Sequence, residues 1–427
     1  MGIIGSVVLL VLLVLGVHVG VALGAVGFVG LSVLIGPASA VAYTASTIFY
    51  VITAYMFIVL PLFIIMGFLA SQGGVARETY DSIEKWVGNV RGGSAIATVW
   101  ACALFGVFTG SAMVAAATFT RVSAPELRRM GYQKEFTYGL IASASTIAML
   151  IPPSALAVIY GLISGDSITK LLLGGIGPGL MITAIYTMGI FLLLGINPRL
   201  AGTSKPKAVT LKEKFAALPY MWPVFVIALI LIGGIYGGVF TTIEAGAAGA
   251  AAILLIGIIL RRIGWSDVKR SAVDTVEVCA MVFLIFACAR VFSRFLTVAG
   301  ISSWILGFTF DLNLSSTAFT IAVSVVFIIL GFFLDSVSML TLVLPLVTPV
   351  VKALGMDPIW FAMVQLVAIH VGMITPPFGI CVYITLGAAE KDVSLEDIFR
   401  GVLPFALLMV ISLVLIIAFP QLCNWAY

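Results

Sequence analysis

The sequence predicts an all-α polytopic membrane protein made of two inverted repeats, each with a re-entrant helical hairpin and a broken transmembrane helix. Three observations support this fold class. The composition is strongly apolar, proline and glycine motifs recur at a fixed offset along the chain, and basic residues are divided unequally between the two copies. Inverted repeats of this kind usually place a binding site near the middle of the bilayer.

The composition excludes a soluble protein. Of the 427 residues, 62% are hydrophobic and 9% are charged, and the mean hydropathy is +1.22, values that soluble domains do not reach. A transmembrane helix takes about 20 mainly apolar residues, and about ten runs of that length are expected. The net charge of +4 comes from a few loop clusters, so it reports membrane topology and gives no indication of nucleic-acid binding.

The first elements along the chain are three spans and a surface helix. Apolar runs predict spans at Ile3 to Ala22, Gly24 to Ala42 and Ile48 to Ala70. We interpret the first run as a retained span, because no basic region or clear cleavage site marks a signal peptide. The segment Arg77 to Arg91 mixes charged and apolar residues, which predicts an amphipathic helix along the inner membrane surface.

The next segment predicts a hairpin followed by a broken helix. Residues 93–125 are too many for one simple span and are interrupted by Thr109-Gly110-Ser111-Ala112, which suggests a re-entrant hairpin. A broken helix is expected at about residues 135–165, with its break at Ile151-Pro152-Pro153-Ser154. A proline pair removes two amide donors and forces the preceding residue out of the helical region, so the helix must open there.

The second half of the chain repeats these motifs. When the sequence is moved by 224 residues, a single proline, a glycine and a proline pair match without gaps: Pro125 with Pro349, Gly131 with Gly355, and Pro152-Pro153 with Pro376-Pro377. Such self-similarity indicates a duplication. We therefore divide the chain into a first repeat at residues 1–210 and a second repeat at residues 211–427.

The second repeat is expected to contain the matching elements. Spans at Leu218 to Phe240 and Ile243 to Leu260 precede an approach helix at Asp267 to Glu277. A second hairpin is expected at about residues 316–349, interrupted by Asp335-Ser336-Val337-Ser338. A second broken helix follows at about residues 359–389, with its break at Thr375-Pro376-Pro377-Phe378.

The basic residues predict opposite orientations for the two copies. The stretch around Pro349 holds only Lys352, whereas the stretch around Pro125 holds four basic residues: Arg121, Arg128, Arg129 and Lys134. Short cytoplasmic loops are enriched in Lys and Arg, so the first stretch is expected inside the cell and the second outside. With these orientations, both termini of the chain are expected outside the cell.

The four interruptions predict a binding site. Non-helical backbone at mid-membrane depth is tolerated only where it is buried in protein or lines a cavity. Freed carbonyl groups suit Na⁺, whereas the N-termini of half-helices suit a carboxylate. Asp335 is the one titratable residue in the interruptions, which favours sodium over proton coupling. Hydroxyl groups that can complete the coordination of Na⁺ belong to Ser111, Ser154, Ser336, Ser338 and Thr375.

A few polar residues lie near apolar runs outside the interruptions. Arg290 and Arg294 follow such a run, where an arginine snorkels, pairs or binds an anion. Arg294 is a candidate for bidentate binding of a substrate carboxylate, or else it marks a helix end at the membrane interface. Glu244 is expected to support a helix junction or a subunit interface. His18 and His370 lie in separate halves, so we expect no metal site other than sodium and no catalytic triad.

With these motifs, the chain resembles the large membrane subunit of tripartite ATP-independent periplasmic (TRAP) transporters, in the ion-transporter superfamily of elevator carriers. The resemblance covers essentially the whole chain. The matching motifs are Gly110-Ser111-Ala112, Ile151-Pro152-Pro153-Ser154, Gly237-Gly238-Val239-Phe240-Thr241 with Glu244-Ala245-Gly246, Asp335 with Pro345 and Pro349, and Gly372-Met373-Ile374-Thr375-Pro376-Pro377-Phe378-Gly379. One departure is Thr241-Thr242-Ile243-Glu244-Ala245, where many relatives have Thr-Pro-Thr-Glu-Ala, and it affects only a local turn.

The resemblance implies sodium-driven import of an organic acid, such as a C4-dicarboxylate, a keto acid or a sialic acid, across the bacterial inner membrane by an elevator movement. It implies two partners, a small membrane subunit of about four helices and a periplasmic substrate-binding protein. No cofactor is expected besides Na⁺ as the coupling ion.

The resemblance also implies two sodium sites, each built from one hairpin tip and one helix break. The first would comprise Gly110, Ser111, Ala112, Pro152, Pro153 and Ser154. The second would comprise Asp335, Ser336, Ser338, Thr375, Pro376 and Pro377. The substrate would lie between them, and the candidate substrate-binding residues are Arg294, Ser111, Ser154 and Thr375.

Other classes of protein fit the sequence less well. A stand-alone Na⁺ or H⁺ carboxylate symporter of the same superfamily would need no capture protein and usually carries Ser-Asn-Thr at its hairpin tips, which this chain lacks. An intramembrane enzyme would need a catalytic pair or a zinc-binding motif, and the sequence contains neither. A structural scaffold would gain nothing from two pairs of helix breaks.

Overall fold

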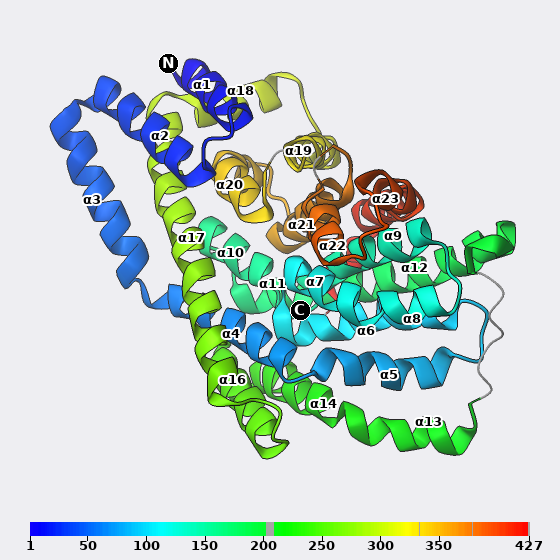
Figure 1. Cartoon of the computed structure of the whole chain (residues 1–427). Coiled ribbons are helices and arrows are strands. Elements are labelled where there is room, and N and C mark those ends of the chain that lie inside the picture. The colour runs from blue at the N-terminus through cyan, green and yellow to red at the C-terminus, as the bar shows by residue number, and fades with distance from the viewer. Residues whose placement is uncertain (202–208, 333, 378, 426–427) are drawn as a thin grey trace.

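The computed structural model describes residues 1–201, 209–332, 334–377 and 379–425, and every regular element in these ranges is a helix (Figure 1). Seven helical segments in the described ranges are long and apolar enough to cross a membrane. They are Tyr55–Gln72 (η1 and α4), Ile168–Ile196 (α11 and α12), Leu211–Tyr236 (α13 to α15), Thr242–Ile259 (α16), Trp265–Val298 (α17), Ser336–Ala353 (α20) and Leu395–Ala418 (α23). The all-α polytopic membrane class is confirmed, although fewer long helices are present than the ten or so expected.

The boundaries predicted for the first three spans were wrong. The structure has α1 at Gly2–Val14, α2 at Val19–Ile35 and α3 at Pro37–Thr53, so the chain turns inside the apolar runs. Gly16 and Gly36 adopt φ values of +80° and +87° at these turns, a conformation that glycine reaches without a steric penalty. Pro37 then opens α3, in the first position of a helix that proline favours.

The approach helix predicted at Asp267 to Glu277 is not a separate element. Residues Trp265–Val298 form one continuous helix of 34 residues, α17. No glycine or proline occurs in this segment, so the change from polar to apolar residues gives the helix no reason to end. The amphipathic helix predicted at Arg77 to Arg91 is present as α5, at Val75–Val87, and its Glu78 pairs with Arg262 just before α17.

Helix boundaries recur at the same offset as the sequence motifs. Helices α7 (Ala112–Val122) and α9 (Lys134–Ser145) begin 224 residues before α20 and α21 (Pro358–Ile374), respectively. The hairpin partner of α7 is α6 (Gly93–Thr109), and that of α20 is α19 (Ser316–Leu330). After the proline pairs, the chain continues as α10 (Ala155–Ser164) in the first half and as α22 (Ile380–Ala388) in the second.

The two halves of the chain interlock through these short helices. Helices α9 and α21 pack against the hairpin of their own half, whereas α10 packs against α20 and α22 packs against α7. Each segment after a proline pair therefore contacts the hairpin of the other half, and these short helices lie among the helices of both halves (Figure 1). The long helix α17 contacts α2, α3, α4 and α20 at the side of this core.

Helix α23 is held closely against α9. A Cβ atom built on Gly139 would lie 2.1 Å from the carbonyl carbon of Gly401, so the two backbones touch at their crossing. At the N-terminal ends of the two helices, Nζ of Lys134 lies 2.7 Å from a carboxylate oxygen of Asp397. Helices from the two halves of the sequence are thus joined by close packing and by an ion pair.

Candidate functional site

The first hairpin tip lies directly against the first helix break. Gly110, with φ of +52°, separates α6 from α7. A Cβ atom built on it would lie 2.1 Å from the carbonyl oxygen of Pro153. The structure therefore brings together the residues predicted for the first sodium site, and Ser111 is the only one of the six that is partly exposed.

The serines of this site begin the two helices. Ser154 Oγ accepts a hydrogen bond of 3.0 Å from the Ala157 amide and donates one to the Met149 carbonyl. Ser111 Oγ accepts a longer bond of 3.4 Å from the Val114 amide. These N-caps point the N-terminal amides of α7 and α10, the positive ends of the helix dipoles, towards the interruptions.

At the second hairpin tip, Asp335 begins α20. One oxygen of its carboxylate accepts a bond of 3.0 Å from the Ser338 amide, and the other accepts one of 2.6 Å from the Ser338 hydroxyl. The arrangement is an N-cap with a full negative charge. It leaves further lone pairs on both carboxylate oxygens, which are suitable ligands for a hard cation.

The second helix break begins at Thr375, whose hydroxyl donates a bond of 2.6 Å to the Val371 carbonyl. Thr375 and Pro376 are partly exposed and Pro377 is exposed, whereas Pro152, Pro153 and Ser154 are buried. The second break is therefore more open than the first. Phe378, the last residue of the predicted break, lies outside the described residues.

Small residues join each hairpin to the segment before its proline pair. In the first half, a Cβ atom on Gly106 would lie 2.8 Å from the Cα of Ala148. In the second half, a Cβ atom on Gly331 would lie 2.6 Å from the Cα of Gly372. These backbone contacts leave no room for larger side chains, so the hairpin and the broken helix are closely fitted in both halves.

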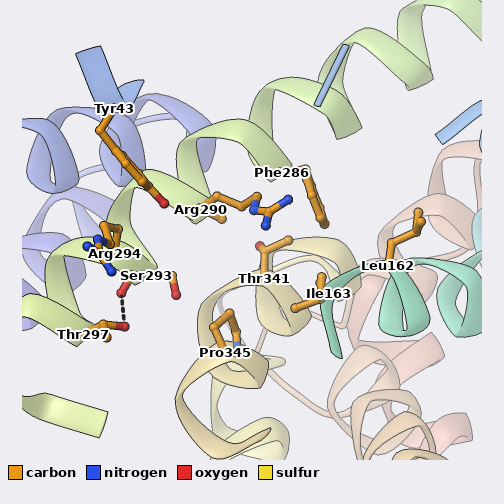
Figure 2. A pocket seen from close by; sticks show the side chains of 11 residues that line it. Tyr43, Leu162, Ile163, Phe286, Arg290, Ser293, Arg294, Thr297, Thr341 and Pro345 are labelled. Carbon is orange, nitrogen blue, oxygen red and sulfur yellow. Dashed lines mark hydrogen bonds between the residues drawn. The ribbon is translucent and has the colours of Figure 1, made fainter. Parts of the chain in front are cut away.

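Arg294 lies in a cavity of about 220 Å³ that is separate from the residues discussed so far (Figure 2). Arg290 shares this cavity, which also includes Tyr43 of α3, Leu162 of α10 and Thr341 of α20. None of the other predicted substrate-binding residues, Ser111, Ser154 and Thr375, is among the residues that line it.

The sequence analysis proposed Arg294 alone as a substrate ligand and did not predict that Arg290 lines the same cavity. The signal was available, because residues four apart on one helix face the same side.

Glu244 lies away from these residues, at the start of α16. Its carboxylate accepts bonds of 2.8 Å from the amide and from the hydroxyl of Thr241, and the Thr241 hydroxyl accepts a bond from the Glu244 amide. This reciprocal pair is a capping box. The geometry gives Glu244 a local role in starting a helix.

His18 lies just before α2, and His370 lies within α21. No three His, Cys, Asp or Glu side chains in the described ranges are arranged to hold a metal ion. His370 is fully buried in α21, and neither ring nitrogen has a hydrogen-bond partner among the described residues. Oxygen atoms from hydroxyl, carboxylate and carbonyl groups are the donors that the interruptions offer, and such hard donors suit alkali cations.

Comparison with known proteins gives a consistent result. The family model described as the tripartite ATP-independent periplasmic transporter, DctM component, matches residues 6–422. The large permease protein of an ectoine TRAP transporter from Halomonas elongata is 32% identical over 370 residues, which covers 86% of this chain and 84% of that protein. The large permease protein of a C4-dicarboxylate TRAP transporter from Pseudomonas aeruginosa is 30% identical over 401 residues, or 92% of each chain.

Two solved structures share the fold at low sequence identity. The YdaH transporter of Alcanivorax borkumensis has a TM-score of 0.62 and 15% identity, with 90% of this chain and 89% of that chain covered. MtrF of Neisseria gonorrhoeae has a TM-score of 0.60 and 12% identity, with 91% and 85% covered. At these identities the likeness concerns the fold alone.

Proposed function

Because the chain belongs to the family of TRAP transporter DctM components, we propose that it imports an organic acid by sodium-coupled secondary transport, after delivery by a periplasmic substrate-binding protein. Members of this family are transporter permeases of the inner membrane, and the seven apolar segments suit that location. A small membrane subunit would complete the complex.

The crossed packing of the short helices supports this proposal most directly. Helix α10, capped by Ser154, packs against α20, capped by Asp335, so each half contributes to this interface a helix that begins at an interruption. N-terminal amides attract a carboxylate, whereas the freed carbonyls and the Asp335 carboxylate attract Na⁺. A site that holds both ions can couple their movements, since each lowers the cost of bringing the other into the membrane.

Sodium coupling rests on the donor types at the interruptions. Asp335 is the one titratable side chain there, and the other candidates are hydroxyl and carbonyl oxygens. A proton-coupled carrier usually has several ionisable residues in the membrane core. We assign the first sodium site to the Gly110 to Ala112 tip with Pro152 to Ser154, and the second to Asp335, Ser336 and Ser338 with Thr375 to Pro377.

The two hairpins and the two broken helices would move as one block in an elevator movement. Each hairpin is fitted to the neighbouring broken helix by backbone contacts, and the crossed packing joins the two halves into one unit. The outer helices, including α2, α4 and α17, would form the fixed scaffold. In this arrangement the two repeats are inverted, with boundaries near residues 1–210 and 211–427.

The substrate class follows from the relatives. Three similar permeases belong to transporters that are named for ectoine, C4-dicarboxylates and sialic acid. A fourth relative, from Oleidesulfovibrio alaskensis, belongs to an isethionate transporter. Each compound carries a carboxylate or a sulfonate. We therefore propose a small organic acid as the substrate of this chain, with one acidic group held at the helix N-termini.

Uptake into proteoliposomes tests the proposal. The proteoliposomes would contain this chain with or without the small subunit and the periplasmic binding protein, under an inward gradient of Na⁺, K⁺ or H⁺. Uptake would be measured for labelled C4-dicarboxylates, keto acids, sialic acid, ectoine and isethionate. We expect uptake of one compound only with all three proteins and an inward Na⁺ gradient. Uptake by this chain alone, or uptake driven by protons without sodium, would indicate a stand-alone symporter.

A further inference from the structure

The cavity next to α17 lies outside both proposed sodium sites. We propose that Arg290 and Arg294 make it a separate anion-binding site, which takes the carboxylate or sulfonate group of a small organic anion. The inference rests on the proposed function in one respect, because it adds a binding step before the substrate reaches the helix N-termini. Anion binding in this cavity does not itself require sodium.

Both arginines line the cavity from a single helix. They are four residues apart on α17, and residues at this spacing lie on the same side of a helix. In Figure 2 the Arg290 side chain extends towards Phe286 and Thr341, and Arg294 lies beside Tyr43 and Thr297. The cavity of about 220 Å³ is larger than the roughly 150 Å³ of a cavity that can hold benzene, so it has room for a small organic acid.

An aromatic ring lies beside each of the two guanidinium groups. The Arg290 guanidinium carbon lies 4.8 Å from the centre of the Tyr50 ring, and that of Arg294 lies 5.8 Å from the centre of the Tyr43 ring. These cation–π contacts are not hydrogen bonds, so the N–H donors of both guanidinium groups stay available to a ligand. Those donors match the two oxygens of a carboxylate or sulfonate group.

The charges of the two arginines have no partner within the described ranges. Neither guanidinium forms a hydrogen bond or an ion pair there, and no Asp or Glu is among the described residues that line the cavity. Both arginines are exposed, so their charges are accessible to a small anion that enters the cavity. A small organic anion would supply the missing charge.

The cavity lies along the same helices that begin at the interruptions. Leu162 of α10 is eight residues after Ser154, about 12 Å along the helix, and Thr341 of α20 is six residues after Asp335, about 9 Å along the helix. Since α10 and α20 pack against each other, an anion in the cavity would lie about two helical turns from both N-termini. That separation makes it a distinct site, close enough to pass its ligand on.

Binding of a defined anion tests the inference without using transport. The full-length protein would be placed in phosphatidylcholine nanodiscs in a potassium buffer free of sodium and titrated calorimetrically with potassium succinate and potassium isethionate. Arg290→Gln and Arg294→Gln remove one guanidinium each. Arg77→Gln is the control, because its side chain is 80% exposed on α5 and lies outside the cavity. Thermal unfolding of every variant would be measured in parallel.

We expect the wild type and Arg77→Gln to bind at least one of the two anions with equal affinity. Arg290→Gln and Arg294→Gln should each bind that anion at least about tenfold more weakly, because each loses a charged hydrogen-bond donor. Arg290→Lys and Arg294→Lys keep the positive charge but lose the paired N–H donors of the guanidinium group, so we expect intermediate affinity. These variants can be measured even if the glutamine variants fail to fold. Affinity that is the same in the wild type and in both glutamine variants would overturn the inference.

A lipid phosphate presents similar oxygens, so a second arm uses nanodiscs that contain phosphatidylglycerol. Native mass spectrometry would show whether this lipid remains on the wild type and is lost from both glutamine variants. That result, together with no binding of succinate or isethionate in either lipid, would overturn the assignment to a soluble anion. Arginine-dependent binding in potassium buffer would support the inference even if sodium-driven uptake failed, which separates it from the proposed function.

Discussion

Gly110 and Pro153 touch where the first hairpin tip meets the first helix break. A Cβ atom on Gly110 would lie 2.1 Å from the Pro153 carbonyl oxygen, closer than real side chains approach. The φ angle of Gly110 is +52°, in the left-handed region that glycine adopts most easily. The tip and the break are therefore fitted together backbone to backbone, and any side chain at this position would separate them.

Replacement of this glycine is expected to disturb the first sodium site. Gly110→Ala should cost about 1–3 kcal/mol of stability from backbone conformation alone. It should also displace the Pro153 carbonyl and raise the Na⁺ concentration required for half-maximal uptake. Uptake at several Na⁺ concentrations and thermal unfolding would measure both effects.

Gly165→Ala is the matched control for Gly110→Ala. Gly165 also has a positive φ, +79°, but no atom lies within 4 Å of a Cβ atom built there. It should therefore lose stability without a change in sodium dependence. Equal sodium dependence in Gly110→Ala and Gly165→Ala would show that the contact with Pro153 has no role in ion binding.

The contact between Gly331 and Gly372 predicts a similar effect at the second hairpin. Gly372→Ala places a Cβ atom 2.8 Å from the Cα of Gly331, and a backbone atom cannot move away cheaply. Overpacking of this kind typically costs about 1–3 kcal/mol, so we expect a lower unfolding temperature and reduced uptake.

A helical glycine in open space is the control for Gly372→Ala. Gly387, in α22, has no atom within 4 Å of its built Cβ atom. Gly387→Ala should be neutral or slightly stabilising, since alanine favours the helix by up to about 1 kcal/mol. If Gly372→Ala behaved in the same way in unfolding and uptake measurements, the close fit of the hairpin to α21 would be unimportant.

The ion pair between Lys134 and Asp397 predicts a defined pH dependence. The hydrogen bond to the Asp397 carboxylate raises the pKa of Lys134 above its ordinary value of 10.5. A raised pKa means that this stabilisation is complete below that value and is lost as the pH rises through the folded-state pKa.

Lys134→Ala should therefore lower the unfolding temperature by the same amount at about pH 6 and about pH 9. The difference from the wild type should shrink only at more alkaline pH, and Lys134→Arg should retain most of the stability. A difference that already changes between these two pH values would mean that another group controls the stability of the α9 and α23 ends.

The helix interruptions were predictable because proline acts locally. The pairs Pro152-Pro153 and Pro376-Pro377 remove amide donors whatever surrounds them, and helices end just before both pairs in the structure. The N-terminal turns were not predictable in the same way. Gly16 and Gly36 lie in apolar runs where glycine is also common inside helices, so composition alone gives no position for a turn.

The arginine cavity shows what the sequence cannot provide. The spacing of Arg290 and Arg294 indicates a shared helix face, but the rings that hold them belong to Tyr43 and Tyr50 of a distant helix. The cavity also requires α20 to lie opposite α17. Such contacts arise from tertiary packing, for which a single sequence contains no direct signal.

Asp335 allows a test that separates helix capping from ion binding. Asn and Asp cap helices about equally well, whereas Ala costs about 1 kcal/mol, so Asp335→Asn should fold like the wild type and Asp335→Ala should be less stable.

Both variants at position 335 lose the negative charge. A negative charge within a few Å of Na⁺ stabilises the bound ion by about 1–4 kcal/mol, for effective dielectric constants between those of water and of a protein surface. The Na⁺ concentration for half-maximal uptake should therefore rise about tenfold or more. Asp357→Asn changes another Asp cap, at the start of α21, where Asp357 accepts bonds from the Ile359 and Trp360 amides and from the Asn424 side chain. It should leave sodium dependence unchanged. Unaltered sodium dependence in Asp335→Asn would remove Asp335 from the ion site and leave it as a cap alone.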